Sequence, residues 1–120
     1  IDFLNEWFFK TMHHEFAHIL HQTKNYSTDF NLISTDYQGP SWLNLESDAE
    51  ANSMGYVTRY ASYSPDEDFV EIISNYVTHA KGYWEGILAN AGTEGGEKLT
   101  QKFEIVRNYG NLSQLDLTTF

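Results

Sequence analysis

Residues 5–22 carry the clearest helical pattern in the chain. The segment contains neither glycine nor proline, and its apolar residues recur three or four positions apart: Phe8, Met12, Phe16, Ile19 and Leu20. Side chains at this spacing share one face of an α-helix. We therefore predict one amphipathic helix here, buried along its apolar side.

The rest of the chain also predicts helices, so the expected fold class is mainly α. Good capping residues begin a helix expected over residues 47–61 and another expected over residues 65–89. A glycine-rich break at residues 92–96 precedes a last helix that ends near residue 110.

A long polar segment separates the first helix from the others. Residues 23–46 are rich in Asn, Ser, Thr and Asp, which is typical of a loop. A short strand near residues 30–34 fits within it. Trp42 and the aromatic residues around Tyr37 either line a substrate cleft or cover the helices, and the sequence leaves both roles open.

Composition limits the partners and the kinds of metal ligand. With 7 basic and 17 acidic residues the formal charge is −10, which repels nucleic acid and anionic membranes. The chain shows no apolar run of membrane-spanning length and no cysteine, so nitrogen and oxygen atoms remain as metal ligands. Its 120 residues correspond to one domain, residues 1–120, which we expect to be a C-terminal piece of a longer protein because it begins inside an apolar stretch.

The predicted first helix contains an H-E-x-x-H motif, His14-Glu15-Phe16-Ala17-His18. Residues four apart have Cβ atoms about 5–6 Å apart on one face, so both histidines can reach one tetrahedral Zn²⁺. Glu15 lies beside the first ligand and can take a proton from an activated water. Such a motif can arise by chance on a solvated helix, but the apolar residues around it favour a metal site.

A catalytic zinc needs a third protein ligand, which a carboxylate further along the chain can supply. The residues that follow the motif do not match the metzincin pattern. Glu67 and Glu71 lie one turn apart on the helix expected from residue 65. We assign Glu67 as the ligand and Glu71 as the acceptor of a hydrogen bond from a ligand histidine. The alternative is that the acidic residues 66–68 only complement the helix dipole.

Two further histidines flank the motif. Successive helix residues point about 100° apart, so His13 faces away from His14 and is expected to be structural or solvated. His21 lies one turn beyond His18, where we expect a surface role or a contact with a ligand.

With these motifs the sequence resembles two groups of metallopeptidases. The spacing Tyr60-x6-Glu67-x3-Glu71 after H-E-x-x-H resembles the gluzincin zinc site of the anthrax lethal factor catalytic domain. More closely, residues 13–22, 59–61 and 67–71 resemble the zinc-binding metallopeptidase lipoproteins of Bacteroidetes that are encoded beside nutrient-import receptor systems.

The resemblance implies an outer-membrane lipoprotein that faces the periplasm or the exterior and hydrolyses peptides or proteins, with a possible association with outer-membrane nutrient-import components. This chain would be the helical part of a zincin-like domain whose upstream sheet is missing. Tyr60 would donate a hydrogen bond to the oxyanion, with Tyr63 as the other candidate and core packing as the alternative role.

We therefore expect a zinc-dependent metallohydrolase of gluzincin type, most simply a peptidase. One alternative is a degenerate zincin that binds substrates or proteins without catalysis, although the intact Glu15 counts against it. A second alternative is a metal-free helical interaction domain, which predicts that the candidate ligands do not converge.

Overall fold

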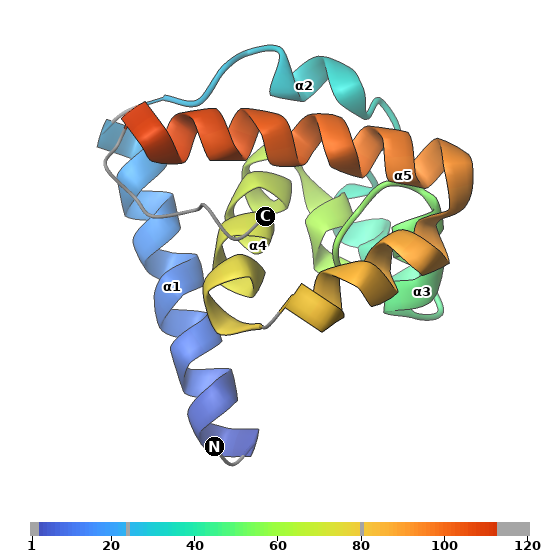
Figure 1. Cartoon of the computed structure of the whole chain (residues 1–120), viewed down its shortest axis with the longest axis horizontal. Helices are drawn as coiled ribbons and strands as arrows, with labels where there is room; N and C mark the ends of the chain where they lie inside the picture. The colour runs from blue at the N-terminus through green and yellow to red at the C-terminus, as the bar shows by residue number, and fades with distance from the viewer. Residues whose placement is uncertain (1–2, 24, 80, 113–120) are drawn as a thin grey trace.

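A computed structural model describes residues 3–23, 25–79 and 81–112 (Figure 1). Every regular element in these ranges is a helix, which confirms the mainly α fold class. The α-helices are α1 (Phe3–Thr23), α2 (Phe30–Ile33), α3 (Asp48–Ser53), α4 (Pro65–Thr78) and α5 (Lys81–Leu112), and the short 3-10 helices are η1 (Gly39–Asn44) and η2 (Tyr60–Tyr63). Among the described helices none is long and apolar enough to cross a membrane.

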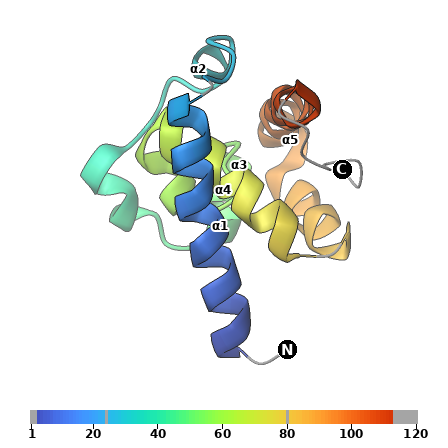
Figure 2. The same ribbon diagram turned by 90° about the vertical axis from the view of Figure 1, so that its left-hand side faces the viewer.

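Helix α4 lies at the centre of the packing. It packs against α1 and also contacts η2 and α5 (Figure 2). Ser64 caps its start by accepting a hydrogen bond from the backbone of Glu67 at 3.2 Å, and Pro65 follows in the first turn, as the sequence predicts. The buried apolar residues of α4 and α5 form much of the core: Phe69, Val70, Ile72, Ile73, Leu99, Phe103 and Val106.

The helix predicted over residues 65–89 is two helices. Helix α4 ends at Thr78, because His79 takes an extended conformation with φ −120° and ψ 152°. In that position His79 stacks on Tyr83 with ring centroids 3.9 Å apart and pairs with Glu6 of α1 at 3.0 Å. These tertiary contacts replace the continuous helix that local propensity favours.

The helix predicted over residues 47–61 is also shorter than expected, since α3 ends at Ser53. The chain turns at Gly55, whose φ of +95° is a left-handed conformation that favours glycine. The buried Asn52 side chain then donates to the carbonyl oxygens of Tyr56 and Val57 at 2.8 and 3.1 Å. The Asn52 side chain thus provides hydrogen-bond donors for two backbone carbonyl groups that lie beyond the end of α3.

The strand predicted near residues 30–34 is wrong, because this segment forms α2. The backbone amide of Phe30 bonds to the carbonyl of Ser27 at 3.1 Å, and the Phe30 ring is fully buried. Edge-on contacts with Tyr26 and Phe69 hold that ring in place. One turn of helix therefore inserts the ring into the core without needing a partner strand.

The predicted glycine-rich break is confirmed as a kink in α5. Gly92 has φ 68° and ψ −159°, and two arms of helix meet there (Figure 1). The second arm approaches α3 closely at Gly95, where an added Cβ would lie 2.5 Å from the carbonyl oxygen of Asn52. Only a residue without a side chain fits between the two helices at this point.

The apolar side of α1 is exposed, contrary to the prediction that it is buried. Phe8, Phe16 and Ile19 are 56%, 55% and 59% exposed, and the start of α1 extends beyond the other helices (Figures 1 and 2). The side that packs on α4 instead carries the fully buried Ala17 and the histidines. The same side of α1 makes polar contacts with α4 through His14 and His18.

Candidate metal centre

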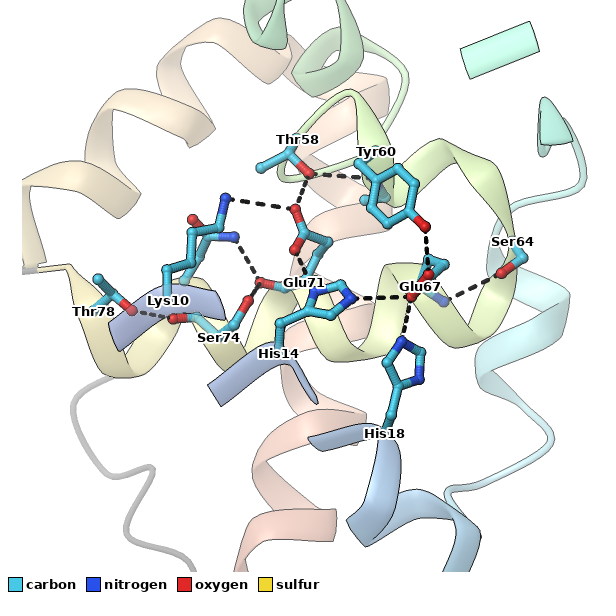
Figure 3. A network of polar contacts seen from close by, with 12 residues as sticks. Lys10, His14, His18, Thr58, Tyr60, Ser64, Glu67, Glu71, Ser74 and Thr78 are labelled. Carbon is cyan, nitrogen blue, oxygen red and sulfur yellow. Dashed lines mark hydrogen bonds and ion pairs between the residues drawn. The ribbon is translucent and has the colours of Figure 1, made fainter. Parts of the chain in front are cut away.

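Three side chains from α1 and α4 converge on one point. His14 and His18 lie one turn apart on α1, and Glu67 lies in the first turn of α4 (Figure 3). The Oε1 atom of Glu67 is 3.2 Å from His14 Nε2 and 2.5 Å from His18 Nε2. One potential ligand atom from each residue lies within 4.8 Å of the others. The convergence contradicts the expectation for a metal-free helical interaction domain.

The donor set fits a catalytic zinc ion. Two imidazole nitrogens and one carboxylate oxygen are the common ligands of catalytic zinc, which keeps a fourth position open. His14 and His18 present the same ring atom, Nε2, toward Glu67. The three residues can therefore hold one divalent ion in the zinc-binding manner that the sequence predicts.

Glu71 supports the first histidine from behind. Its Oε2 atom accepts a hydrogen bond from His14 Nδ1 at 2.8 Å, in the arrangement that the sequence predicts. Its Oε1 atom accepts from Thr58 Oγ1 at 2.7 Å and lies 3.7 Å from Lys10 Nζ. Sequence reasoning did not identify Lys10 or Thr58. Lys10 could have been found because it precedes His14 by one helical turn, whereas nothing in the sequence points to Thr58.

Charges near the site shift two pKa values. Burial opposes the charged form of His14, but hydrogen bonding to Glu71 and the charges of Glu71, Glu67 and Glu15 outweigh it and raise the pKa of His14. Burial likewise opposes the charged form of Glu71, but the bond from His14, the charge of Lys10 and the bond from Thr58 lower its pKa overall. The pair therefore favours a charged imidazole beside a carboxylate when no metal is bound.

Tyr60 contacts the site through the candidate ligand. Its hydroxyl donates to Glu67 Oε2 at 2.7 Å, which leaves Oε1 facing the histidines (Figure 3). Burial and the bond to Glu67 raise the pKa of Tyr60, so the hydroxyl keeps its proton and acts as a donor. The Tyr60 ring packs near Trp42 and Tyr63, with centroids 5.0 and 5.7 Å away. Trp42 therefore lies beside the site.

Glu15 and the two histidines that flank the motif differ in their surroundings. Glu15 is exposed, and its charge contributes to the raised pKa of His14. His13 is half-buried and stacks on Phe9 with ring centroids 6.5 Å apart. His21 is buried, and its Nε2 atom lies 3.1 Å from His18 Nδ1.

This chain is similar in sequence and fold to known proteins. The family described as "Putative zinc-binding metallo-peptidase" matches residues 2–115. A crystal structure titled as that of "a putative zinc-binding metallo-peptidase from Bacteroides caccae ATCC 43185" matches with 42% identity and a TM-score of 0.87, covering 95% of this chain and 44% of that chain. This chain thus spans less than half the length of that protein. Among curated proteins, none matches. The sequence match over nearly the whole chain and the shared fold show that this protein belongs to the zinc-binding metallo-peptidase family.

Proposed function

We propose that this protein is a zinc-dependent peptidase of gluzincin type, in which His14, His18 and Glu67 hold the metal. The observation that carries the proposal is the approach of Glu67 Oε1 to the Nε2 atoms of both histidines, at 3.2 and 2.5 Å. Glu71 adds support, because zinc-bound histidines usually donate a hydrogen bond from their outer N–H group to an acceptor of this kind.

The chain's own residues would carry out the proton transfers. When bound, zinc acts as a Lewis acid that lowers the pKa of water to about 7 and polarises a carbonyl group. Glu15 takes a proton from the attacking water and returns it to the leaving amine, so peptide and water become a carboxylate and an amine. Its exposure leaves the Glu15 carboxylate accessible to a substrate.

Tyr60 is proposed to stabilise the developing oxyanion. That role requires a protonated hydroxyl, and the raised pKa of Tyr60 means that its hydroxyl keeps the proton. The hydroxyl must exchange its 2.7 Å bond to Glu67 for one to the substrate oxygen. Tyr60→Phe is therefore expected to lower kcat by about 10²- to 10³-fold, the usual loss when one oxyanion donor is removed.

Peptide hydrolysis by the zinc-loaded protein tests this function. A mixture of peptides is incubated with the wild type and with Glu15→Gln, and new termini are counted by mass spectrometry. We expect Glu15→Gln to bind zinc as well as the wild type and to hydrolyse about 10²- to 10⁴-fold more slowly. Zinc binding without hydrolysis by either protein would instead support the alternative of a non-catalytic binding module.

The cellular location of the protein is proposed from the resemblance alone. A lipoprotein of the outer membrane, associated with nutrient import, would act on peptides or proteins in the periplasm or outside the cell. Fractionation of cells that express the whole protein tests the location. Recovery in the cytosolic fraction would contradict it.

A further inference from the structure

The outer nitrogen of His18 faces another histidine. His18 Nδ1 lies 3.1 Å from His21 Nε2, and His21 is only 8% exposed. Phe69 and Tyr26 contact the His21 ring edge-on, with centroids 6.3 and 5.8 Å away. The pair therefore lies on the packed side of α1, where neighbouring rings restrict how His21 can turn.

Metal binding would fix which of these two rings donates the hydrogen bond. A histidine ligand binds through a lone pair and is neutral. The Nε2 atom of His18 faces Glu67 at 2.5 Å, so a metal held there uses Nε2 and leaves the proton of His18 on Nδ1. That N–H can be donated to His21 only if His21 Nε2 is unprotonated and its own proton is on Nδ1.

The two candidate histidine ligands thus have outer partners of different chemistry. His14 Nδ1 contacts the carboxylate of Glu71 at 2.8 Å, whereas His18 Nδ1 contacts an imidazole at 3.1 Å. A neutral imidazole accepts this bond without adding a further negative charge to the site. It also follows His18 by three residues on the same helix, so one element positions both the ligand and its partner.

We propose that His21 is a positioning residue of the metal centre, whose Nε2 atom accepts the Nδ1 proton of His18 and so fixes the tautomer and orientation of that ligand. The inference rests on the metal site in the proposed function. Outer partners of this kind typically change metal affinity by about 10- to 100-fold when they are removed. A residue that only packs against Phe69 would leave the metal affinity unchanged.

Zinc affinity, measured by competition with a chromophoric chelator, tests the role of His21. We expect His21→Leu to bind zinc about 10- to 100-fold more weakly than the wild type. His21→Gln should recover most of the affinity, because its amide oxygen can accept the same hydrogen bond. His13→Leu is the matched control on the same helix and should bind like the wild type. Circular dichroism of the metal-free proteins checks that each variant is folded.

Nitrogen-15 NMR of the zinc-loaded wild type identifies which ring nitrogen of each histidine carries the proton. A role in packing alone would not determine the position of that proton. We expect both His18 and His21 to be neutral, with the proton on Nδ1. A proton on Nε2 of His21, or a folded His21→Leu with wild-type zinc affinity, would overturn the inference about His21. A wild type that binds no zinc would overturn the proposed function, so the two failures are distinguishable.

Discussion

The carboxylate of Glu71 and the imidazole of His14 form a 2.8 Å hydrogen bond between residues 57 positions apart. The bond joins α4 to α1 behind the candidate metal centre (Figure 3). Both partners are largely withdrawn from solvent, with side chains 13% exposed for His14 and 5% for Glu71. In this position Glu71 can orient the His14 ring and increase its basicity as a ligand.

Replacement of Glu71 by Gln is expected to weaken zinc binding. The amide keeps the shape of the side chain but lacks the negative charge that strengthens the hydrogen bond from His14. We predict a loss of about 10- to 100-fold in zinc affinity, measured by chelator competition. Glu94→Gln, at an exposed position of α5, is the control and should bind as the wild type does. Equal affinities in all three proteins would contradict the role of Glu71.

The stability of the metal-free protein is expected to depend on pH through this pair. The raised pKa of His14 means that its contribution is complete below about pH 6.5 and is lost as the pH rises through the folded-state pKa. The lowered pKa of Glu71 means that its contribution is complete above about pH 4.5 and is lost as the pH falls through the folded-state pKa. The pair therefore stabilises most between these values.

Urea unfolding in the presence of a chelator, repeated across this pH range, measures the effect. Glu71→Gln should reduce the loss of stability above pH 6.5, because the charged form of His14 no longer has its carboxylate partner. A wild type whose stability rises steadily from pH 6.5 toward pH 8 would contradict a raised pKa of His14 in the folded protein.

A buried ion pair connects α5 to α4. Lys102 Nζ lies 2.7 Å from Asp68 Oδ2, and both side chains are fully buried. Lys102 also donates to the carbonyl oxygen of Gly55 at 2.7 Å. Removing one partner leaves an uncompensated charge in the interior, so Lys102→Met should lower the free energy of unfolding by about 3–5 kcal/mol.

A surface pair provides the comparison for this measurement. Arg107 Nη1 and Glu104 Oε2 lie 2.9 Å apart, with side chains 36% and 61% exposed. Arg107→Met should cost at most about 1 kcal/mol, because exposed ion pairs are screened by water. If the Lys102 and Arg107 variants unfold at the same urea concentration, the buried ion pair does not contribute the predicted free energy of unfolding.

Replacing either of two neighbouring glycines of α5 by alanine should change the stability of the protein, in opposite directions at the two positions. An added Cβ at Gly95 would lie 2.5 Å from Asn52 O and 2.7 Å from Ser53 O, so Gly95→Ala should cost about 1–3 kcal/mol. At Gly96 such a Cβ would have no described atom within 4 Å apart from its chain neighbours and the nearby backbone of its own helix, so Gly96→Ala should stabilise by about 0.5–1 kcal/mol. Thermal unfolding of both variants distinguishes them. Equal melting temperatures would mean that α3 and α5 are less closely packed at Gly95.

The sequence predicts the helices that local signals define. The capping pair Ser64 and Pro65 correctly marks the start of α4, and Gly92 correctly marks the kink of α5. Helix α3 ends before Gly55, a residue that the helix predicted over residues 47–61 included. The end of α4 could not be predicted, because it depends on contacts between distant segments. His79 leaves the helical conformation where it contacts Glu6 and Tyr83, and no local sequence pattern predicts these contacts.

The candidate site was more predictable than the packing around it. A four-residue spacing on one helix places His14 and His18 together whatever the rest of the chain does. The orientation of α1 was predicted wrongly, because periodicity assumes that an apolar face is a buried face. Phe16 is 55% exposed in this chain, which spans less than half the length of the matched protein, whereas the largely buried His14 faces α4.

The zinc content of the purified protein after dialysis against metal-free buffer tests the central claim most directly. Elemental analysis is made on the wild type, His18→Ala, Glu67→Ala and the control His13→Ala. We predict about one zinc ion per chain in the wild type and in the control, and little or none in the two ligand variants. A wild type that takes up no zinc even from excess metal, or ligand variants that retain it fully, would contradict the metal centre and the function built on it.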